Sequence, residues 1–213
     1  NSVKNLIFLG SSCVYPSNIK NKIKESHLLK SYLEKTNEGY AIAKIAIAKL
    51  CEFAGKEHGL NYKTIIPCNL YGKWDKFDPK TSHMIPGAIR KIHEAKSSYI
   101  SPIIWGDGSA RREFMYAEDL ADFIHWSFDN YNLLDSYTNL GIGKDWSILE
   151  YYQEISKIIG FNGSFEYDLK KPTGMQRKLC SIEKQKKLGW KPKHSLKQGL
   201  KKTYEFYIEQ YGI

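Results

Sequence analysis

The sequence predicts an α/β protein in which helices pack against a parallel, doubly wound sheet. Two apolar stretches, residues 6–10 and 62–67, have the length of strands, and a helical stretch at 37–58 separates them. A strand, a helix and a second strand joined by short links form a βαβ unit, whose two strands run parallel. Of the 213 residues 42% are hydrophobic, so the chain can bury a substantial core.

The first predicted strand, residues 6–10, is apolar throughout, which is typical of a strand buried inside a parallel sheet. The chain enters this strand at once and does not begin with methionine, so we expect that further residues precede Asn1 in the natural protein. A small-residue turn at 10–16 and a polar loop to about residue 35 follow the strand.

The helix predicted at 37–58 is amphipathic, and Gly59 is a candidate for its C-terminal cap. Its apolar stripe comprises Ile42, Ile45, Ala46, Leu50 and Phe53.

Helices and strands continue to alternate along the rest of the chain. A capping box of Ser147 and Glu150 marks the start of one helix. Helices are predicted at 85–95, 119–128, 147–159, 181–188 and 196–210, and strands at 100–105, 112–115, 137–140 and near Phe165. Residues 73–81 are predicted to form a loop and 106–109 a turn.

The net charge is +9, and the last third of the chain is especially basic. A nucleic-acid-binding surface is one interpretation, but these lysines alternate with helix-periodic apolar residues and no nucleic-acid-binding motif accompanies them. These lysines are better explained as the solvent-exposed faces of helices. Binding of small anionic ligands is the next alternative. We therefore expect no nucleic-acid partner.

Membrane and metal chemistry are also not expected. No apolar run approaches the roughly 18–20 residues that a membrane helix needs, and the start of the chain lacks a signal-peptide layout, so a cytoplasmic location is predicted. The four cysteines form no C-x-x-C pair, which predicts neither a disulfide framework nor a metal site.

Tyr40 and Lys44 are four residues apart at the start of the helix predicted at 37–58, so both project from the same face. A lysine ammonium beside a phenol oxygen stabilises the phenolate, which allows a tyrosine to exchange a proton near neutral pH. By itself the spacing is common, and the alternative is a surface tyrosine beside a solvated lysine.

Two neighbouring strand ends support the catalytic interpretation. Ser11, Ser12 and Cys13 follow the first strand, and residues 67–70 follow the second, both at carboxyl ends, where α/β sheets bind ligands. A serine hydroxyl next to Tyr40 would bind the same substrate oxygen. Serine, tyrosine and lysine together predict carbonyl–alcohol interconversion with a hydride-donating cofactor.

These segments resemble the extended short-chain dehydrogenase/reductases that act on nucleotide-sugars. The resemblance covers almost the whole chain, and its most specific parts are the Ser-Ser-Cys segment at 11–13 and the Ser-His-Met-Ile-Pro segment at 82–86. Further matching segments are 36–44, 69–72, 105–108, 111–114, 139–143, 171–172, 174, 177–178 and 188–190.

The resemblance implies a role for each of five residues. Tyr40 would protonate the 4-keto oxygen of the substrate, Lys44 would assist Tyr40 and hold the nicotinamide ribose, and Ser11 would bind the substrate oxygen. Cys13 and His83 would be the acid/base pair that epimerises C3 and C5. The alternatives are a small core residue for Cys13 and a helix-capping residue for His83.

The resemblance also implies binding residues for an NADP(H) cofactor and a GDP-sugar substrate. Expected cofactor contacts are Leu9, Gly10, Ser11, Ser12, Tyr40, Lys44, Pro67, Cys68, Asn69, Leu70 and His83. Expected substrate contacts are Lys91, Trp105, Arg112 and Thr173, the last at a position where the family usually has aspartate. A surface ion pair with Glu113 or Asp119 is the alternative for Arg112, and core packing is the alternative for Trp105.

The chain departs from this family because it contains no Gly-x-x-Gly-x-x-Gly turn to hold the cofactor pyrophosphate. We therefore expect a Rossmann-type sheet that lacks about three N-terminal βα units, and 213 residues that are by themselves inactive and bind NADPH weakly. Residues 1–72 and 117–145 would be the remaining cofactor-binding domain. Residues 73–116 and 146–213 would be the nucleotide-sugar domain.

The implied activity is NADPH-dependent 3,5-epimerisation and 4-reduction of GDP-4-keto-6-deoxy-mannose to GDP-L-fucose, by a homodimer. One alternative is a 4-reductase that acts on a related GDP-4-keto-6-deoxy sugar, such as a heptose. Another is a non-catalytic, nucleotide-binding relative.

Overall fold

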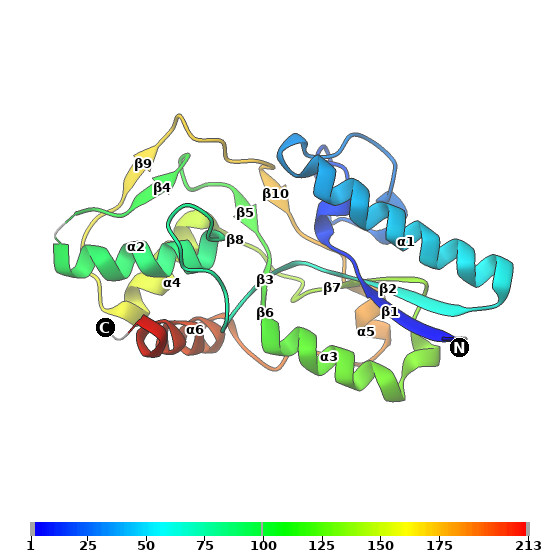
Figure 1. Cartoon of the computed structure of the whole chain (residues 1–213). Helices are drawn as coiled ribbons and strands as arrows, with labels where there is room; N and C mark the ends of the chain where they lie inside the picture. Colours follow the sequence, from blue (N-terminus) through cyan, green and yellow to red (C-terminus); the bar gives the residue numbers. More distant parts are fainter. Residues whose placement is uncertain (1–2, 99, 212–213) are drawn as a thin grey trace.

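The computed structural model describes residues 3–98 and 100–211. Asn1 and Ser2, the beginning of the segment that we expected to lead directly into the first strand, lie outside the described residues. Figure 1 shows two groups of elements side by side, one around strands β1, β2 and β7 and one around helices α2, α4 and α6. None of the described helices is long and apolar enough to cross a membrane.

The first group is the predicted parallel sheet, which confirms the fold class. Strands β1 (Asn5–Leu9), β2 (Asn61–Pro67) and β7 (Tyr137–Leu140) pair in the order β1-β2-β7, all parallel. Helix α1 (Glu38–His58) lies on one side of this sheet and α3 (Ala117–Asp129) on the other (Figure 1). The carboxyl ends of β1 and β2 therefore meet at one edge of the sheet.

Strand β1 is less buried than its apolar sequence predicts. Its first two residues are exposed, with Leu6 at 38%, and the other three are only half-buried. In the described chain β1 pairs with β2 alone, whereas β2 has a strand on each side and is buried from Thr64 to Pro67. The prediction of a buried strand was wrong because β1 lies at the edge of this sheet.

The predicted apolar stripe of α1 was also largely wrong. Ala41, Ile45, Ala48 and Cys51 form the buried face. From the predicted stripe Ile42, Ala46, Leu50 and Phe53 are exposed instead. Small side chains let α1 approach the sheet closely, so the larger ones are left on the opposite face.

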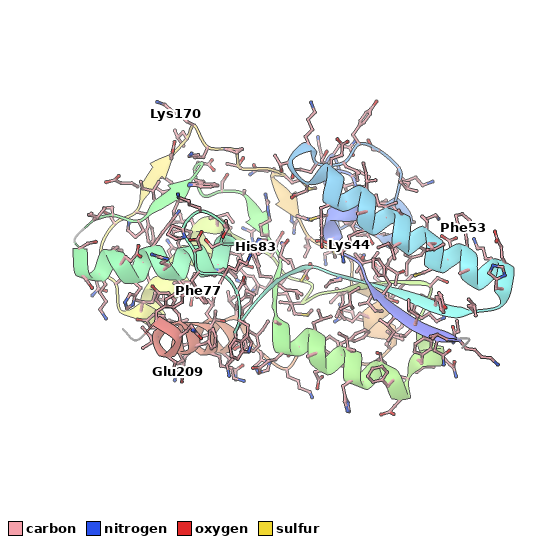
Figure 2. The ribbon with its side chains drawn as sticks, in the orientation of Figure 1. Lys44, Phe53, Phe77, His83, Lys170 and Glu209 are labelled. Atoms are coloured by element: carbon pink, nitrogen blue, oxygen red, sulfur yellow. The ribbon has the colours of Figure 1, made fainter. Side chains whose placement is uncertain are left out.

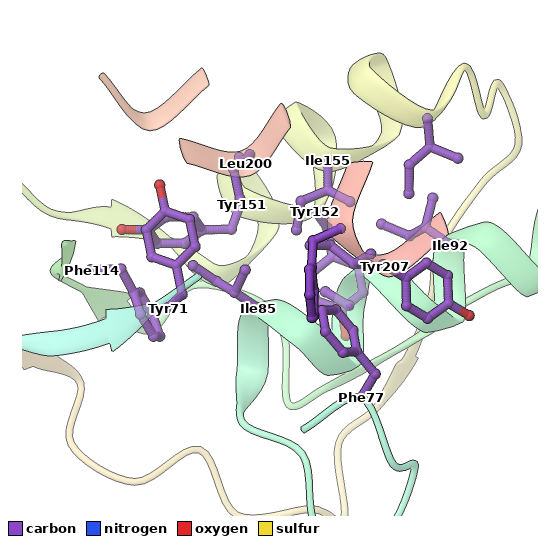
Figure 3. Packing of buried hydrophobic residues seen from close by; sticks show 14 of the residues in the cluster. Tyr71, Phe77, Ile85, Ile92, Phe114, Tyr151, Tyr152, Ile155, Leu200 and Tyr207 are labelled. Carbon is purple, nitrogen blue, oxygen red and sulfur yellow. The ribbon is translucent and has the colours of Figure 1, made fainter. Parts of the chain in front are cut away.

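The second group of elements forms the largest core. Helices α2 (Met84–Ser98), α4 (Ile148–Ile159) and α6 (Leu196–Tyr211) surround it. Figure 3 shows the aromatic side chains of this core packed around the isoleucines of α2 and α4. The predicted capping box is present, with the Ser147 and Glu150 side chains each accepting a backbone N–H of the other.

The chain also forms three small sheets. Strand β3 (Asn69–Tyr71) pairs with β6 (Phe114–Tyr116), and β4 (Ile103–Trp105) with β9 (Glu166–Asp168), both parallel. Strand β5 (Arg111–Arg112) lies between β10 (Arg177–Lys178) and β8 (Trp146–Ser147). The single strand predicted at 112–115 is therefore two strands in different sheets, because the chain changes neighbours at Glu113.

Short elements complete the fold. They are helix α5 (Glu183–Lys187) and the 3-10 turns η1 (Ser12–Val14), η2 (Glu25–His27), η3 (Lys35–Asn37) and η4 (Tyr131–Leu133). The C-terminal segment returns to the first group, where Trp190 packs beside Phe123 and Leu140, and Cys180 packs beside Val14 and Ile66.

Candidate active site

A cavity of about 890 Å³ opens where β1 and β2 end, between the two groups of elements. From the first group it is lined by Gly10, Ser11, Cys13, Tyr40, Pro67, Cys68, Asn69 and Leu70, and from the second by His83, Lys91, Trp105, Arg112 and Thr173. The structure thus brings most of the predicted site residues around one space. Leu9, Ser12 and Lys44 are not part of its lining.

Tyr40 and Lys44 occupy consecutive turns of α1, as their spacing predicts. The Tyr40 side chain is 52% exposed and lines the cavity. The Lys44 ammonium donates a hydrogen bond of 2.9 Å to the carbonyl oxygen of Leu9 and lies 5.7 Å from the centre of the Tyr40 ring. Lys44 is therefore anchored to β1 rather than solvated, and its charge is held beside the tyrosine.

The turn after β1 presents two of its three predicted residues to the cavity. Ser11 precedes η1, and its Oγ accepts the backbone N–H of Cys13 at 3.2 Å, so its own O–H remains available as a donor. Ser12 is buried, at 2% exposure. Cys13 is half-buried, and its sulfur lies 3.4 Å from Nζ of Lys178.

His83 faces this turn from the start of α2, and Figure 2 places it and Lys44 at the facing ends of α2 and α1. Its backbone carbonyl accepts the N–H of Gly87 at 3.0 Å, so the helix-capping contact is made by the main chain. The imidazole is exposed and lines the cavity. Asp75, which the sequence did not single out, lines the same wall, and burial raises the pKa of its carboxyl.

Trp105 lines the cavity, and the ammonium groups of two lysines lie over its ring. Its ring is 54% exposed, so it is not a core residue. Nζ of Lys91 lies 5.5 Å and Nζ of Lys171 lies 5.4 Å from the ring centre. Burial lowers the pKa of the Lys91 ammonium, which also donates to the carbonyl of Ile103. The indole ring can stack on a planar group, and the two ammonium groups can bind anionic groups beside it.

Arg112 projects from β5 and donates from Nη2 to the carbonyl of Thr173 at 2.8 Å. Burial lowers the pKa of its guanidinium. Arg112 does not form the surface ion pair with Glu113 or Asp119 that was its alternative role. Asp119 pairs with His194 instead, and Glu113 accepts backbone N–H groups. Arg112 therefore remains a cavity residue.

The segment after β2 forms the floor of the cavity. Its Cys68 thiol is buried, which raises its pKa, and lies 3.4 Å from the carbonyl oxygen of Asn69. Asn69 in turn donates from its side chain to the carbonyl of Glu113 at 2.9 Å. These contacts tie the segment after β2 to Glu113 at the carboxyl end of the parallel sheet, where ligands of α/β proteins bind.

Two residues of the site region gave no usable signal in the sequence. Lys178 belongs to a segment that matches the family, but only the fold brings it next to Cys13, 165 residues away. Trp74 lines the cavity at φ +67°, a backbone conformation that bulky residues avoid, and its ring packs on Phe206. In addition, the described residues contain no group of three or more His, Cys, Asp or Glu placed to hold a metal ion.

Comparisons with known proteins agree with the predicted family. The model of the NAD dependent epimerase/dehydratase family matches residues 1–143. The chain is 49% identical over 212 residues to the GDP-L-colitose synthase of Yersinia pseudotuberculosis, covering 99% of this chain and 69% of that protein. It is 48% identical over 207 residues to the GDP-L-fucose synthase of Azorhizobium caulinodans, covering 97% and 66%.

A solved structure extends the comparison to the fold. The GDP-mannoheptose C4 reductase of Campylobacter jejuni, solved with NADP bound, superposes with a TM-score of 0.84 at 36% identity, covering 96% of this chain and 68% of that one. This chain thus spans about two thirds of the length of the curated relatives it matches.

Proposed function

Because the chain belongs to the NAD dependent epimerase/dehydratase family, we propose that the protein containing it converts GDP-4-keto-6-deoxy-mannose into GDP-L-fucose by 3,5-epimerisation and NADPH-dependent 4-reduction. The observation that carries this proposal is the single cavity that joins Tyr40 and Ser11 to Cys13 and His83. Relatives named GDP-L-fucose synthase, at 41–48% identity, support the same substrate.

In the reduction, Tyr40 donates its phenolic proton to the 4-keto oxygen. The Lys44 charge, fixed by the Leu9 carbonyl, stabilises the phenolate that remains. The Ser11 hydroxyl donates a hydrogen bond to the same oxygen and so orients the carbonyl. Bound NADPH supplies the hydride.

The residues around the end of β1 fit the nicotinamide end of this cofactor. Gly10, Pro67 and Leu70 line the cavity beside Tyr40, with apolar and backbone surface for a flat ring. The Lys44 ammonium, 5.7 Å from the centre of the Tyr40 ring, would hold the ribose. Leu9 and Ser12, which are not part of the cavity lining, would support the cofactor-binding residues from behind.

In the epimerisation, Cys13 and His83 exchange protons with the carbons next to the ketone. A hydrogen α to a ketone is acidic enough for a thiolate or an imidazole to remove. Inversion requires a base on one face of the sugar and an acid on the other. Cys13 and His83 suit these roles because they line the cavity from different groups of elements.

The nucleotide half of the substrate would lie along the second wall of the cavity. The Arg112 guanidinium, which lines the cavity and donates to the carbonyls of Arg111 and Thr173, would bind the diphosphate with its remaining N–H groups. Trp105 and Lys91 would contact the substrate on the same wall.

The two-step activity can be separated from the main alternative with solvent deuterium. We expect the reduced product made in D2O to carry deuterium at both C3 and C5, because each proton removed during epimerisation exchanges with solvent. Cys13→Ser should lower the rate of this incorporation about 10²-fold or more, the usual contribution of a positioned acid or base, while the fold is kept. A product without deuterium at C3 and C5 would favour a 4-reductase, the activity named for the Campylobacter relative.

A homodimer is proposed from the outer face of α1. Ile42, Leu50 and Phe53 are 53%, 66% and 48% exposed, an apolar row along a helix that is otherwise packed on the sheet. The second helix considered for this role, α2, buries its apolar side chains in the core. A second copy of α1 is therefore the occupant that we propose.

Leu50→Glu should convert the dimer to a monomer in analytical ultracentrifugation, because two buried carboxylates would face each other across the symmetric contact. Leu133→Glu is the matched control, since Leu133 is 61% exposed outside this row. An unchanged mass for Leu50→Glu would place the contact elsewhere.

The division into two domains and the cytoplasmic location stay predictions. Residues 73–116 and 146–213 supply most of the core around α2, α4 and α6, which supports a separate nucleotide-sugar domain. The four cysteines are all unpaired thiols, as expected in a reducing compartment. Two separate unfolding transitions of the protein would support the division into domains. Recovery of the protein outside the cytoplasmic fraction of the cell would contradict the location.

A further inference from the structure

We infer that Asp145 is a positioning residue, which holds Arg112 in place for the diphosphate of the substrate. The inference rests on the proposed function, in which Arg112 binds this diphosphate, and it identifies the charged group behind Arg112 on which that binding depends. Asp145 is not part of the cavity lining and would not touch the substrate. It acts through strand β5, which carries Arg112.

The segment 110–114 presents its side chains alternately to opposite sides, as an extended chain does. Every second residue of it lines the cavity, namely Ala110, Arg112 and Phe114. The two residues between them contact the segment after β7 instead. Arg111 donates to the side chain of Asp145, and Glu113 accepts the backbone N–H of Gly143. One face of β5 is therefore fixed from behind, and the other faces the cavity.

The carboxylate of Asp145 joins two strands on the fixed face. Its side chain is 6% exposed and accepts Nε of Arg111 at 3.3 Å, and Nε and Nη2 of Arg177 at 2.5 and 3.3 Å. Its backbone carbonyl accepts Nη2 of Arg111 at 2.9 Å. Arg111 and Arg177 are partners in the register of β5 and β10, so one buried carboxylate binds both strands. Glu150, 3.2 Å from Arg111, balances the second positive charge.

The next pair in the same register faces the cavity. Arg112 pairs with Lys178. Arg112 lines the cavity, and Nζ of Lys178 lies 3.4 Å from the sulfur of Cys13, which also lines it. Within residues 3–98 and 100–211, no carboxylate oxygen lies within 4.0 Å of the Arg112 guanidinium. The positive charges behind the strands are thus neutralised, whereas that of Arg112 is left for an anion.

The position of Arg112 depends on this arrangement because β5 and β10 are each only two residues long. Without the charge of Asp145, the guanidiniums of Arg111 and Arg177 would repel each other and lose the anion that they share. Arg112 also donates from Nη1 to the carbonyl of Arg111 at 2.8 Å, so a displaced Arg111 displaces its guanidinium. A shift of about 1 Å is enough to misalign its N–H groups with a diphosphate.

Binding of GDP to the whole protein tests this inference without turnover. Asp145→Asn keeps the shape of the side chain and removes its charge. It should raise the Kd for GDP, measured by isothermal titration calorimetry, about tenfold, which corresponds to one hydrogen bond from a charged group. The Kd for NADPH, measured by fluorescence titration, should stay unchanged, because the expected nicotinamide pocket at the ends of β1 and β2 does not include β5.

A second variant keeps the test valid if Asp145→Asn does not fold, which circular dichroism would show. Arg177→Gln removes one of the two ion pairs at a side chain that is 44% exposed. It loosens β10 from β5 while Asp145 keeps Arg111. The Kd for GDP should therefore rise by less, about threefold.

Glu52→Gln is the matched control. The Glu52 carboxylate also binds two cations, Lys49 and Lys56, each at 2.5 Å, and its side chain is only 17% exposed. It lies on α1 outside the cavity lining. Removal of its charge should leave the affinity for GDP unchanged.

Two results would overturn the inference. One is an unchanged or lowered Kd for GDP in Asp145→Asn, or in Arg177→Gln where Asp145→Asn does not fold. The other is an equal loss of affinity for GDP and NADPH, which would show that Asp145 only stabilises the fold.

The outcomes also distinguish this inference from the proposed function. If GDP affinity depends on Asp145 but the whole protein does not convert GDP-4-keto-6-deoxy-mannose, the role of Asp145 stands and the proposed activity is wrong. If the conversion takes place and GDP affinity does not depend on Asp145, the activity stands and the inference is wrong.

Discussion

Tyr40→Phe should lower the rate of NADPH oxidation by the whole protein about 10²- to 10⁴-fold, the usual contribution of a positioned general acid. Phenylalanine keeps the ring that lines the cavity beside Lys44 but cannot donate a proton to the 4-keto oxygen. Because the Tyr40 side chain is 52% exposed, its hydroxyl adds little to stability. The effect should therefore appear in kcat, measured from the decrease in NADPH absorbance.

The same variant should still exchange deuterium into the unreduced keto-sugar, since that step uses Cys13 and His83. Tyr32→Phe is the matched control, because Tyr32 is 88% exposed in the loop before α1 and outside the cavity lining. Turnover at the parent rate in Tyr40→Phe would remove the basis for the reductase proposal.

Glu113→Ala should lower the free energy of unfolding by about 2–6 kcal/mol at pH 5, measured by urea denaturation. The Glu113 carboxyl is 1% exposed and accepts the backbone N–H of Gly143 at 2.6 Å and of Cys180 at 3.0 Å. Each buried donor that loses its partner costs about 1–3 kcal/mol. Gly141 makes this approach possible, because a Cβ there would lie 2.4 Å from Oε1 of Glu113.

Glu113 should also make stability depend on pH. Burial raises the pKa of its carboxyl to about 7, from 4.5. Above pH 4.5 the unfolded chain gives up this proton more readily than the folded chain, so stability present below pH 4.5 is lost as pH rises to about 7. The loss attributable to Glu113 is about 3 kcal/mol, at 1.36 kcal/mol for each pKa unit.

Glu113→Gln should remove this dependence between pH 5 and pH 8, because an amide does not titrate in that range. The cost of Glu113→Ala should likewise shrink toward pH 8, where the parent protein has itself lost stability. Glu57→Ala, at an exposed position of α1, should change neither stability nor its pH dependence. Equal pH profiles for the parent and Glu113→Gln would contradict the prediction.

Much of the fold could be predicted from local pattern. The β1-α1-β2 unit, the capping box of α4 and the αL residue Gly59 depend on neighbouring residues or on strand–helix alternation, which the sequence shows directly. Burial was harder to predict. The apolar residues of β1 and the larger apolar residues of α1 look like core residues in sequence, but whether they are covered depends on elements from distant parts of the chain.

The candidate site, too, could be predicted only in part from local pattern. Tyr40, Lys44, Ser11 and Cys13 could be singled out from the sequence because residues that follow a strand, or lie on one face of a helix, have a short-range spacing. The contacts that define their chemistry could not, because Lys44 to Leu9 and Lys178 to Cys13 join residues 35 and 165 positions apart. Residue type and spacing thus indicate the reaction class. The packing of distant segments decides which charged group lies beside which proton donor.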